Sequence, residues 1–401
     1  MKQKRLMLLG GLRYLIPVID AAHEEGYYVI TCDYIPGNIA HKYSDEYFNV
    51  SIIDKEAVLD IAQKLNIDGI MSFAVDPGVV TAAYVAEKMG LPFAGSYEAV
   101  KILQNKDLFR KFQYDNGFNV PFSKSYSKYE IAAEDLDQFT FPIIVKPTDS
   151  AGSKGVSRVD LPSQLRTAFK NALDNSISGR AIIEEFIEKA GFSSDSDCFS
   201  IDGELKVVTF SSQRFDNQAP NPYVPCAFTW SSSFSRVHER YLSDELQRLI
   251  KLLDLKTSIY NVETRIGKDG KPYIMEVSPR GGGNRLSEMI RYGSGVDLIR
   301  ASVRAAVGDH VDDMHSPVFS GNWAEIILHA ERDGIFGGLR VSPEYADYVV
   351  ESDLWIESGD MVRCFKGAND TIGTLVMCFP DKYCLDRAMS DINRWCRINI
   401  I

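Results

Sequence analysis

The stretch Tyr260–Gly283 reads YNVETRIGKDGKPYIMEVSPRGGG, and it decides the fold expected for this chain. Two runs of mixed apolar and polar residues flank the polar segment Gly267–Lys271. Such a pattern is typical of a β-hairpin, and an Asp-Gly pair favours a two-residue turn. The sequence therefore predicts a hairpin whose tip is formed by Asp269 and Gly270.

Two carboxylates meet in this predicted hairpin. Glu263 lies directly opposite Glu276 on one face, while Tyr273 and Met275 fall on the core-facing side. Carboxylates about 5 Å apart repel each other and destabilise a sheet unless a cation lies between them. Oxygen ligands of this kind suit Mg²⁺, so the hairpin predicts a magnesium site. The alternative interpretation is an exposed polar face that Arg265 and water neutralise.

Residues suited to phosphate occur at two further places. Arg280 and three glycines, residues 281–283, directly follow the hairpin. Lys146 ends the predicted strand Phe141–Lys146, and the Gly- and Ser-rich loop Thr148–Val156 comes next. Backbone amides in such a loop surround phosphate oxygens, because glycine allows close approach and positive φ. The loop does not match the Walker A pattern, and taken alone it fits an ordinary surface turn equally well.

The first third of the chain alternates strands and helices. Arg5–Leu9, Tyr28–Cys32 and Gly69–Ser72 are short apolar strands, and residues with helical spacing lie between them. This rhythm predicts a parallel sheet covered on both faces, which binds ligands at the carboxyl ends of its strands. Those ends carry Gly10, Gly11, Asp33 and Asp76. The pattern G-x-G-x-x-G is absent, which argues against a nicotinamide site.

The remainder of the chain mixes helices and strands. Helices are predicted over Pro162–Asn175 and Asp244–Leu255, and a strand over Ala181–Ile187. Ser211–Phe234 has little periodicity and is expected to be a long functional loop. From about His310 the pattern predicts a final α+β segment.

Composition indicates a globular protein of two or three domains. The chain has 401 residues, of which 45% are hydrophobic and 25% are charged. Its net charge of -11 argues against a nucleic-acid partner. No apolar stretch approaches the roughly 20 residues needed to cross a membrane. The seven cysteines form no C-x-x-C pair, so a reducing cytoplasm is the expected setting.

Five motifs occur together in an order that is typical of one superfamily. They are Asn105-Lys106, Val145-Lys146-Pro147, the Gly- and Ser-rich loop, Glu184-Glu185-Phe186-Ile187 and Glu276-Val277-Ser278-Pro279-Arg280. This ordered set resembles the ATP-grasp superfamily. The likeness is nearest to the halves of the carbamoyl-phosphate synthase large subunit, biotin carboxylases, purine-pathway members and L-amino-acid ligases. It covers roughly residues 1–310 and extends only loosely to the C-terminal segment.

The resemblance implies nucleotide contacts for individual residues. Lys106 and Lys146 match the two lysines that reach the ATP phosphates. The loop residues that close over these phosphates are Ser150, Gly152, Ser153 and Gly155. Glu184 matches the side chain that reads adenine, Ile187 matches the backbone that reads it, and Phe186 would hold that backbone in place.

The resemblance also implies the metal site and the catalytic residues. Glu263 and Glu276 match the magnesium ligands, and Ser278 stands where the family often has asparagine. Serine is the poorer cation ligand, so a second metal would be held through water or more weakly. Arg280 matches the arginine that steadies the transferred phosphoryl group or the acyl intermediate, and Lys146 is the second candidate catalytic residue.

One further motif departs from the family pattern. Ser193 stands where the motif G-x-E-x-S-x-D has glutamate. Ribose contacts then fall to Glu188 or Asp195.

The expected architecture combines α/β and α+β parts. An N-terminal parallel α/β domain covers residues 1–115, and an ATP-grasp domain covers 116–308 with a lid at about 120–187. An α+β segment, residues 309–401, completes the chain. ATP and Mg²⁺ are expected between lid and lobe, with the substrate facing the N-terminal domain.

The leading function is a ligase that uses ATP and Mg²⁺ to activate a carboxylate as an acyl phosphate. The enzyme then joins it to an amine or similar nucleophile and releases ADP and phosphate. One alternative is a bicarbonate-activating enzyme similar to a carboxylase or carbamoyl-phosphate synthase, and the other is a non-catalytic ATP-binding protein. The expected partners are a small-molecule carboxylate and an amine, with no nucleic acid and no membrane, and a homodimer is left open.

Overall fold

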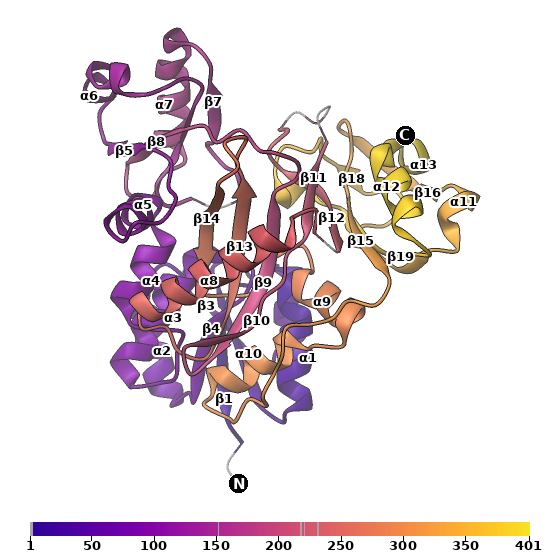
Figure 1. Ribbon diagram of the computed structural model, residues 1–401. Coiled ribbons are helices and arrows are strands. Elements are labelled where there is room, and N and C mark those ends of the chain that lie inside the picture. The colour runs from indigo at the N-terminus through magenta and orange to yellow at the C-terminus, as the bar shows by residue number, and fades with distance from the viewer. Residues whose placement is uncertain (1–2, 151, 217–218, 220, 231) are drawn as a thin grey trace.

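The computed structural model describes residues 3–401 except 151, 217–218, 220 and 231 (Figure 1). The N-terminal part is built on four parallel strands in the order β3-β2-β1-β4, so the predicted parallel sheet is confirmed. The strands are β1 (Arg5–Leu9), β2 (Tyr28–Asp33), β3 (Glu46–Asn49) and β4 (Gly69–Ser72). The helices are α1 (Ile16–Glu24), α2 (Lys55–Leu65), α3 (Asp76–Met89), α4 (Tyr97–Gln104) and α5 (Lys106–Asp115), and two short 3-10 helices cover Arg13–Leu15 and Ile39–Lys42.

Alternation along β1 explains why both faces of this sheet are covered. Leu6 and Leu8 pack with α1 on one face, while Met7 and Leu9 pack with α2 and α3 on the other. The first face also receives a helix from much later in the chain, α10 (Leu298–Ala306). The N-terminal sheet is therefore packed directly against the second half of the molecule.

The lid is a separate antiparallel sheet in the order β5-β8-β6-β7. Its strands are β5 (Ser123–Tyr126), β6 (Ile143–Pro147), β7 (Ser157–Val159) and β8 (Ala181–Glu185). Its helices are α6 (Tyr129–Glu134) and α7 (Leu165–Asp174), with 3-10 helices over Leu136–Gln138 and Pro162–Gln164. Figure 1 shows the lid at the upper left, beside the ends of β13 and β14.

The central lobe carries the hairpin. Its sheet has the order β10-β9-β13-β14, with strands β9 (Ser194–Ile201), β10 (Glu204–Val207), β13 (Ser258–Ile266) and β14 (Pro272–Ser278). Its helices are α8 (Arg236–Leu252) and α9 (Leu286–Ser294), in addition to α10. The N-cap of α8 is Ser235, whose side chain accepts a hydrogen bond from the backbone of His238. The helix therefore begins well before Asp244, where the sequence pattern had placed its start.

The C-terminal part contains two sheets. A five-stranded sheet has the order β11-β12-β15-β19-β17, and a three-stranded sheet has the order β18-β16-β20. The strands are β11 (Ser212–Phe215), β12 (Pro225–Trp230), β15 (Asn322–Leu328), β16 (Gly334–Val341), β17 (Val349–Leu354), β18 (Met361–Val362), β19 (Gly373–Phe379) and β20 (Cys396–Ile400). The helices are α11 (Pro343–Ala346), α12 (Lys382–Ser390) and α13 (Ile392–Trp395), with a 3-10 helix over Ala368–Asp370.

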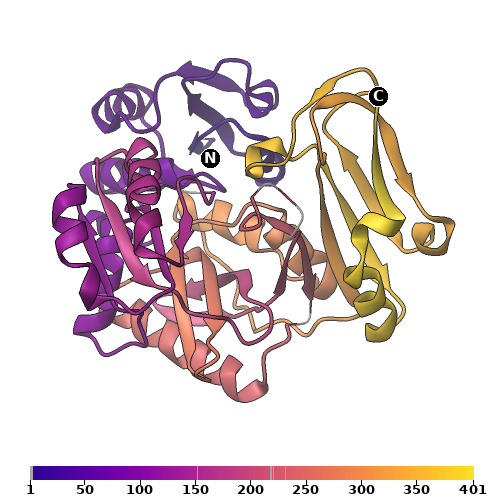
Figure 2. The ribbon, with the colours of Figure 1, turned by 90° about the horizontal axis from the view of Figure 1, so that it is seen from above.

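The prediction of a long loop over Ser211–Phe234 is wrong. Strands β11 and β12 lie within this range and pair with each other, and β12 also pairs with β15. Both faces of this pair are covered, so the strands lack the simple alternation that the sequence pattern requires. The five-stranded sheet thus joins residues from both sides of the predicted boundary at residue 308. Figure 2 shows the C-terminal layer standing beside the central lobe. Among the described residues, no helix is long and apolar enough to span a membrane.

Candidate functional site

The hairpin places Glu263 directly opposite Glu276, and Asn261 opposite Ser278, as the sequence predicts. The route to this register differs from the prediction. The backbone amide of Gly267 bonds to the carbonyl of Lys271, and that of Gly270 bonds back to Gly267. The turn is therefore centred on Lys268 and Asp269, with Gly270 at φ +78 after it, and the predicted two-residue tip is wrong.

A β-bulge restores the register. Ile274 pairs with Thr264, but Glu276 pairs with Glu263, so Met275 is the extra residue. The extra residue also changes which side chains of β14 point to which face of the sheet between the bulge and the turn. Tyr273 is buried as expected, opposite Arg265, but Ile274 rather than Met275 joins the hydrophobic core, so the expected core position of Met275 is wrong.

Each of the two glutamates has a counter-charge just beyond hydrogen-bonding distance. Lys106 Nζ lies 3.6 Å from Glu276 Oε2, and Arg265 Nη2 lies 3.5 Å from Glu263 Oε1. Both separations exceed an ordinary hydrogen bond, so each carboxylate keeps the capacity to bind a cation. Among the described residues, no group of three or more His, Cys, Asp or Glu side chains is placed to hold a metal ion. Two carboxylates fit Mg²⁺, which usually completes its octahedral shell with water and phosphate oxygens.

A third carboxylate lies beside this pair on the neighbouring strand. Asp195 of β9 is the register partner of Glu263, and its Oδ1 accepts a hydrogen bond from Asn261 at 2.7 Å. Burial, together with the negative charge of Glu263, raises the pKa of Asp195 to about 8. Asp197 lies two residues further along β9, opposite Asn261, and burial raises its pKa to about 6. The ionised forms of these two acids are therefore disfavoured unless a positive charge lies beside them.

Arg280 is held by Asp76, which begins α3 at the carboxyl end of the N-terminal sheet. Its Nε and Nη2 donate to the two oxygens of Asp76 at 2.8 and 2.7 Å, and Nη1 donates to Asn261 and to the Gly281 carbonyl. Burial opposes ionisation of Asp76, but the Arg280 charge outweighs it and lowers the pKa of that carboxyl. The hydroxyl of Ser278 donates to Asp76 at 2.9 Å and accepts from Gln104 at 2.6 Å.

Lys146 and Glu184 form a buried ion pair between two lid strands. Lys146 Nζ lies 2.7 Å from Glu184 Oε2, and Arg110 of α5 donates to Glu184 Oε1 at 2.8 Å. Burial alone would raise the pKa of Glu184, but the charges of Arg110 and Lys146 lower it to about 2. Burial lowers the pKa of Lys146 against the attraction of Glu184. Arg110 also donates to the Met275 carbonyl, so it ties the lid to the hairpin.

Lys106 ties the Gly- and Ser-rich loop to the start of α5. Its backbone amide donates to the Thr148 carbonyl, and its ammonium group donates to the Ser150 carbonyl, both at 2.9 Å. Three loop residues adopt left-handed backbone conformations: Gly152, Ser153 and Gly155. Ser153 donates to the Tyr223 carbonyl at 3.3 Å, so the loop touches the β11–β12 connection. Ala151 lies outside the described residues.

The predicted adenine hinge follows β8. The backbone amide of Phe186 donates to Pro142, and the Arg158 guanidinium lies 4.6 Å from the centre of the Phe186 ring. The carbonyl of Ile187 accepts a hydrogen bond from Arg265 at 3.2 Å. The hinge is therefore connected through Arg265 to Glu263 of the proposed metal pair.

Sequence reasoning missed Arg110 and did not assign Asp76 a partner. Arg110 is buried and contacts both lid and hairpin, but no motif marks it, because its partners lie far away in sequence. In the sequence, Asp76 was marked only by its position after a predicted strand of the parallel sheet. Asp195 was considered only as a ribose contact, and its place beside Glu263 follows from strand pairing.

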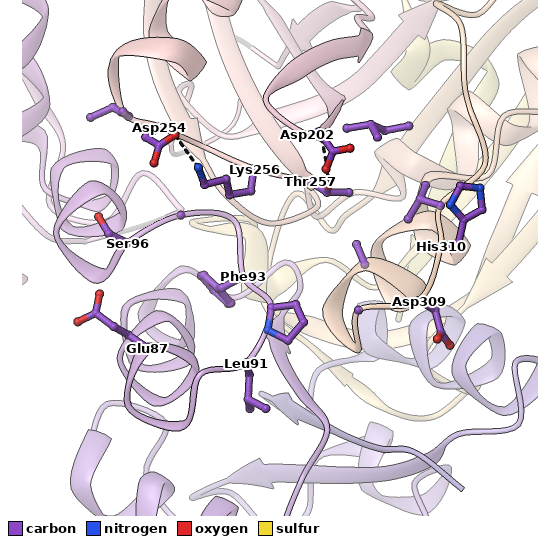
Figure 3. Close-up of a pocket in the computed structure, with 17 residues that line it drawn as sticks. Glu87, Leu91, Phe93, Ser96, Asp202, Asp254, Lys256, Thr257, Asp309 and His310 are labelled. Atoms are coloured by element: carbon purple, nitrogen blue, oxygen red, sulfur yellow. Dashed lines mark hydrogen bonds and ion pairs between the residues drawn. The ribbon is translucent and has the colours of Figure 1, made fainter. Parts of the chain in front are cut away.

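Two cavities lie apart from these residues. The cavity in Figure 3 has a volume of about 670 Å³ and is lined by the segments that follow α3, α8, β9 and α10. At its rim Lys256 pairs with Asp254 at 2.6 Å. A second cavity of about 980 Å³ lies among β11, β15, α12 and β20. Neither cavity is lined by a residue that was predicted to bind ATP or metal.

Known proteins resemble this chain in sequence and in fold. The chain is 26% identical over 329 residues to the carbamoyl phosphate synthase large chain of Pseudothermotoga lettingae, covering 78% of this chain and 29% of that relative. The chain thus spans less than a third of the length of that protein. The L-amino acid ligase of Bacillus licheniformis superposes with a TM-score of 0.83 at 18% identity over 100% of both chains.

A second similar structure was solved with nucleotide. It is the biotin carboxylase domain of the Hydrogenobacter thermophilus 2-oxoglutarate carboxylase, in complex with MgADP, ADP and bicarbonate. It matches with a TM-score of 0.74 at 16% identity, over 99% of this chain and 91% of that one. Residues 139–288 match the model of the ATP-grasp domain, which includes β6, the hinge and the hairpin. The chain therefore contains an ATP-grasp domain, and its resemblance to the ATP-grasp ligases is confirmed.

Proposed function

We propose that this protein uses ATP and Mg²⁺ to activate a carboxylate as an acyl phosphate and joins it to an amine, releasing ADP and phosphate. The observation that carries the proposal is the approach of Lys106 to Glu276 at 3.6 Å. A lysine that binds a polyanion and a glutamate that binds a metal ion are both satisfied by a nucleotide phosphate with its cation. The row of acids from Asp195 to Glu276 supports the cation, and the glycine-rich loop supports the phosphate.

Different residues of the chain would bind the metal ion and the phosphates. Glu263 and Glu276 would hold Mg²⁺, which neutralises phosphate charge when bound. Lys106, Lys146 and the loop residues Ser150, Gly152, Ser153 and Gly155 would bind phosphate oxygens. The Glu184 carboxylate fixes the position of Lys146 before a nucleotide arrives.

Arg280 acts through its charge. Four hydrogen bonds to Asp76, Asn261 and the Gly281 carbonyl fix its guanidinium. A fixed cation costs no reorganisation when negative charge develops on the transferred phosphoryl group or acyl intermediate. We propose that this preset charge is its catalytic contribution.

Several finer assignments belong to the same proposal. Glu184, Phe186 and Ile187 form the adenine hinge, and Ser278 supports the metal site through its contact with Asp76. The domain limits 1–115, 116–308 and 309–401 are retained, with β11 and β12 of the middle range completing the C-terminal sheet. The cytoplasmic setting and the homodimer stay predictions.

Hydroxylamine trapping tests the proposed function. The protein is incubated with ATP, Mg²⁺, hydroxylamine and pools of amino acids or small carboxylates, and nucleotides and hydroxamates are quantified. We expect a hydroxamate together with an equal amount of ADP. AMP and pyrophosphate would contradict phosphoryl transfer to the carboxylate. A parallel bicarbonate reaction is included because the relatives include carbamoyl phosphate synthases, and ADP formation there without any carboxylate would favour that alternative.

A further inference from the structure

One face of helix α5 is turned toward the proposed nucleotide site. The helix lies beside the lid and close to β14 (Figure 1). It begins at Lys106, and Arg110 and Gln113 follow at positions four and seven residues later. Residues three or four positions apart lie on the same face of a helix, so these three side chains share one face. Arg110 and Gln113 are only 3% and 0% exposed.

Arg110 is shared between the lid and the hairpin strand. Its Nε donates to Glu184 Oε1 at 2.8 Å, and its Nη1 donates to the Met275 carbonyl and to Gln113 Oε1, both at 2.9 Å. Gln113 in turn donates to the Ile274 carbonyl at 2.8 Å. Strand β14 is the last strand of its sheet, and side chains of α5 rather than another strand bind these two carbonyls. Arg110 therefore fixes the lid strand β8 relative to β14.

The buried charges around Glu184 do not cancel. One of its oxygens accepts from Arg110, and the other lies 2.7 Å from Lys146 Nζ. Two cations thus share one carboxylate, and the group keeps an excess of positive charge. Such an excess is screened less in the interior than at the surface, and a phosphate group would offset it. Without Arg110, Lys146 and Glu184 would neutralise each other, and Lys146 would attract a phosphate less strongly.

The second contact of Arg110 reaches the proposed metal site. Met275 is the extra residue of the β-bulge and directly precedes Glu276, which the bulge places opposite Glu263. A guanidinium group is planar and its N–H groups point in fixed directions. The bond from Arg110 to the Met275 carbonyl therefore holds the bulge, and with it the backbone of Glu276, at a set distance from the lid.

We propose that Arg110 is a positioning residue that makes the binding of ATP and the binding of Mg²⁺ depend on each other. It holds the Lys146 ammonium group in place through Glu184. It holds Glu276 in place through the carbonyl of Met275. This inference rests on the proposed function, because it takes Lys146 as a phosphate ligand and Glu276 as a metal ligand.

Calorimetric titration with ATP, first in EDTA and then in excess MgCl₂, tests this role without turnover. The ratio of the two dissociation constants measures how far Mg²⁺ tightens ATP binding, and we expect Mg²⁺ to tighten it in the wild-type protein. Arg110→Met keeps a similar side-chain length but removes the charge. We expect it to weaken ATP binding in EDTA about 10-fold or more, the loss of one charge-assisted contact. We also expect the Mg²⁺ ratio to fall toward one.

Arg110→Lys separates the two contacts. Its ammonium group keeps a charge beside Glu184, so ATP affinity in EDTA should recover most of the loss seen in Arg110→Met. One ammonium group lacks the planar fork that serves Glu184 and the Met275 carbonyl together, so the Mg²⁺ ratio should stay below the wild-type value. A residue that only supports the fold would not divide its effects in this way.

Arg304→Met is the matched control. Arg304 of α10 is a partly buried arginine that pairs with Glu25 at 3.0 Å, and neither residue belongs to the proposed site. Its loss should lower stability against urea while leaving ATP affinity and the Mg²⁺ ratio at their wild-type values. Urea unfolding of each variant shows that it is folded before its titration is compared.

Several outcomes would overturn the inference. They are a wild-type protein that binds ATP equally well with and without Mg²⁺, a wild-type EDTA affinity or Mg²⁺ ratio in Arg110→Met, and an equal loss in Arg304→Met. Where Arg110→Met does not fold, a wild-type Mg²⁺ ratio in Arg110→Lys overturns it instead. A wild-type protein that binds no ATP would overturn the proposed function together with this inference. Hydroxamate formation by the wild-type protein reports on the proposed function alone, so the two failures are distinguished.

Discussion

At the scale of single residues, Glu263 and Glu276 are the proposed ligands of Mg²⁺, and substitution of either one tests that role. Glu263→Gln and Glu276→Gln should each reduce ADP formation at least about 100-fold, because each removes a charged ligand from the proposed Mg²⁺ site. Stability should hold or rise slightly, since opposed like charges destabilise a sheet by roughly 0.2–1 kcal/mol. Turnover and urea unfolding are measured side by side, with Glu357→Gln, at an exposed C-terminal position, as the control. Full activity in both hairpin variants, or activity that survives EDTA, would refute the metal assignment.

Lys106 and Lys146 are proposed to bind the phosphates of ATP. Lys106→Ala and Lys146→Ala should each weaken ATP binding by roughly 1.5–3 kcal/mol, the worth of a charge-assisted hydrogen bond. Lys146→Ala should also destabilise the fold, because it leaves Glu184 buried with Arg110 as its remaining charge partner. Calorimetric titration with ATP is the measurement, and Lys111→Ala, an exposed lysine of the same helix, is the control. Unchanged affinity in both variants would remove the lid from the proposed site.

Residue identity could be predicted from the sequence where a motif is local. The opposition of Glu263 and Glu276 followed from one hairpin, and Lys146 followed from a strand and its loop. Asp76 and Arg110 could not be assigned, because their partners are brought to them only by tertiary packing.

At the scale of elements, the hairpin differs from the prediction in two ways, and their effects on the strand register cancel. The turn is one residue longer than the Asp-Gly pattern predicts, and the bulge at Met275 restores the expected pairing of Glu263 with Glu276. A bulge has no local sequence requirement strong enough to reveal it, because it depends on what both strands pack against. The same limit explains β11 and β12, which are covered on both faces and were expected to be a loop.

The turn itself can be tested through Gly270. Its φ of +78 is unfavourable for residues with a side chain, but nothing lies within 4 Å of an added Cβ. Gly270→Ala should therefore cost about 1 kcal/mol through backbone strain alone. Urea unfolding gives the difference, and Gly37→Ala, with no positive φ and no close neighbour, is the matched control. Equal stability of the two variants would contradict the turn described here.

At the scale of the whole molecule, the proposed site is assembled from the N-terminal part and the middle part of the chain. Asp76 of the N-terminal domain positions Arg280 of the lobe, and Arg110 connects the lid with the hairpin. The β11–β12 pair extends the C-terminal sheet back into the lobe. The order of motifs along the chain predicted the fold class. The predicted boundary at residue 308 does not separate independent sheets, because β12 pairs with β15 across it.

In the proposed reaction, a carboxylate oxygen of the substrate attacks the γ-phosphorus of ATP. Isotope transfer tests it most directly: the protein turns over ATP with a carboxylate labelled with ¹⁸O, and ³¹P NMR follows the label. An acyl phosphate intermediate predicts that one ¹⁸O atom appears in inorganic phosphate and that ADP is unlabelled. The label in AMP, or unlabelled phosphate formed together with the ligated product, would contradict an acyl phosphate intermediate.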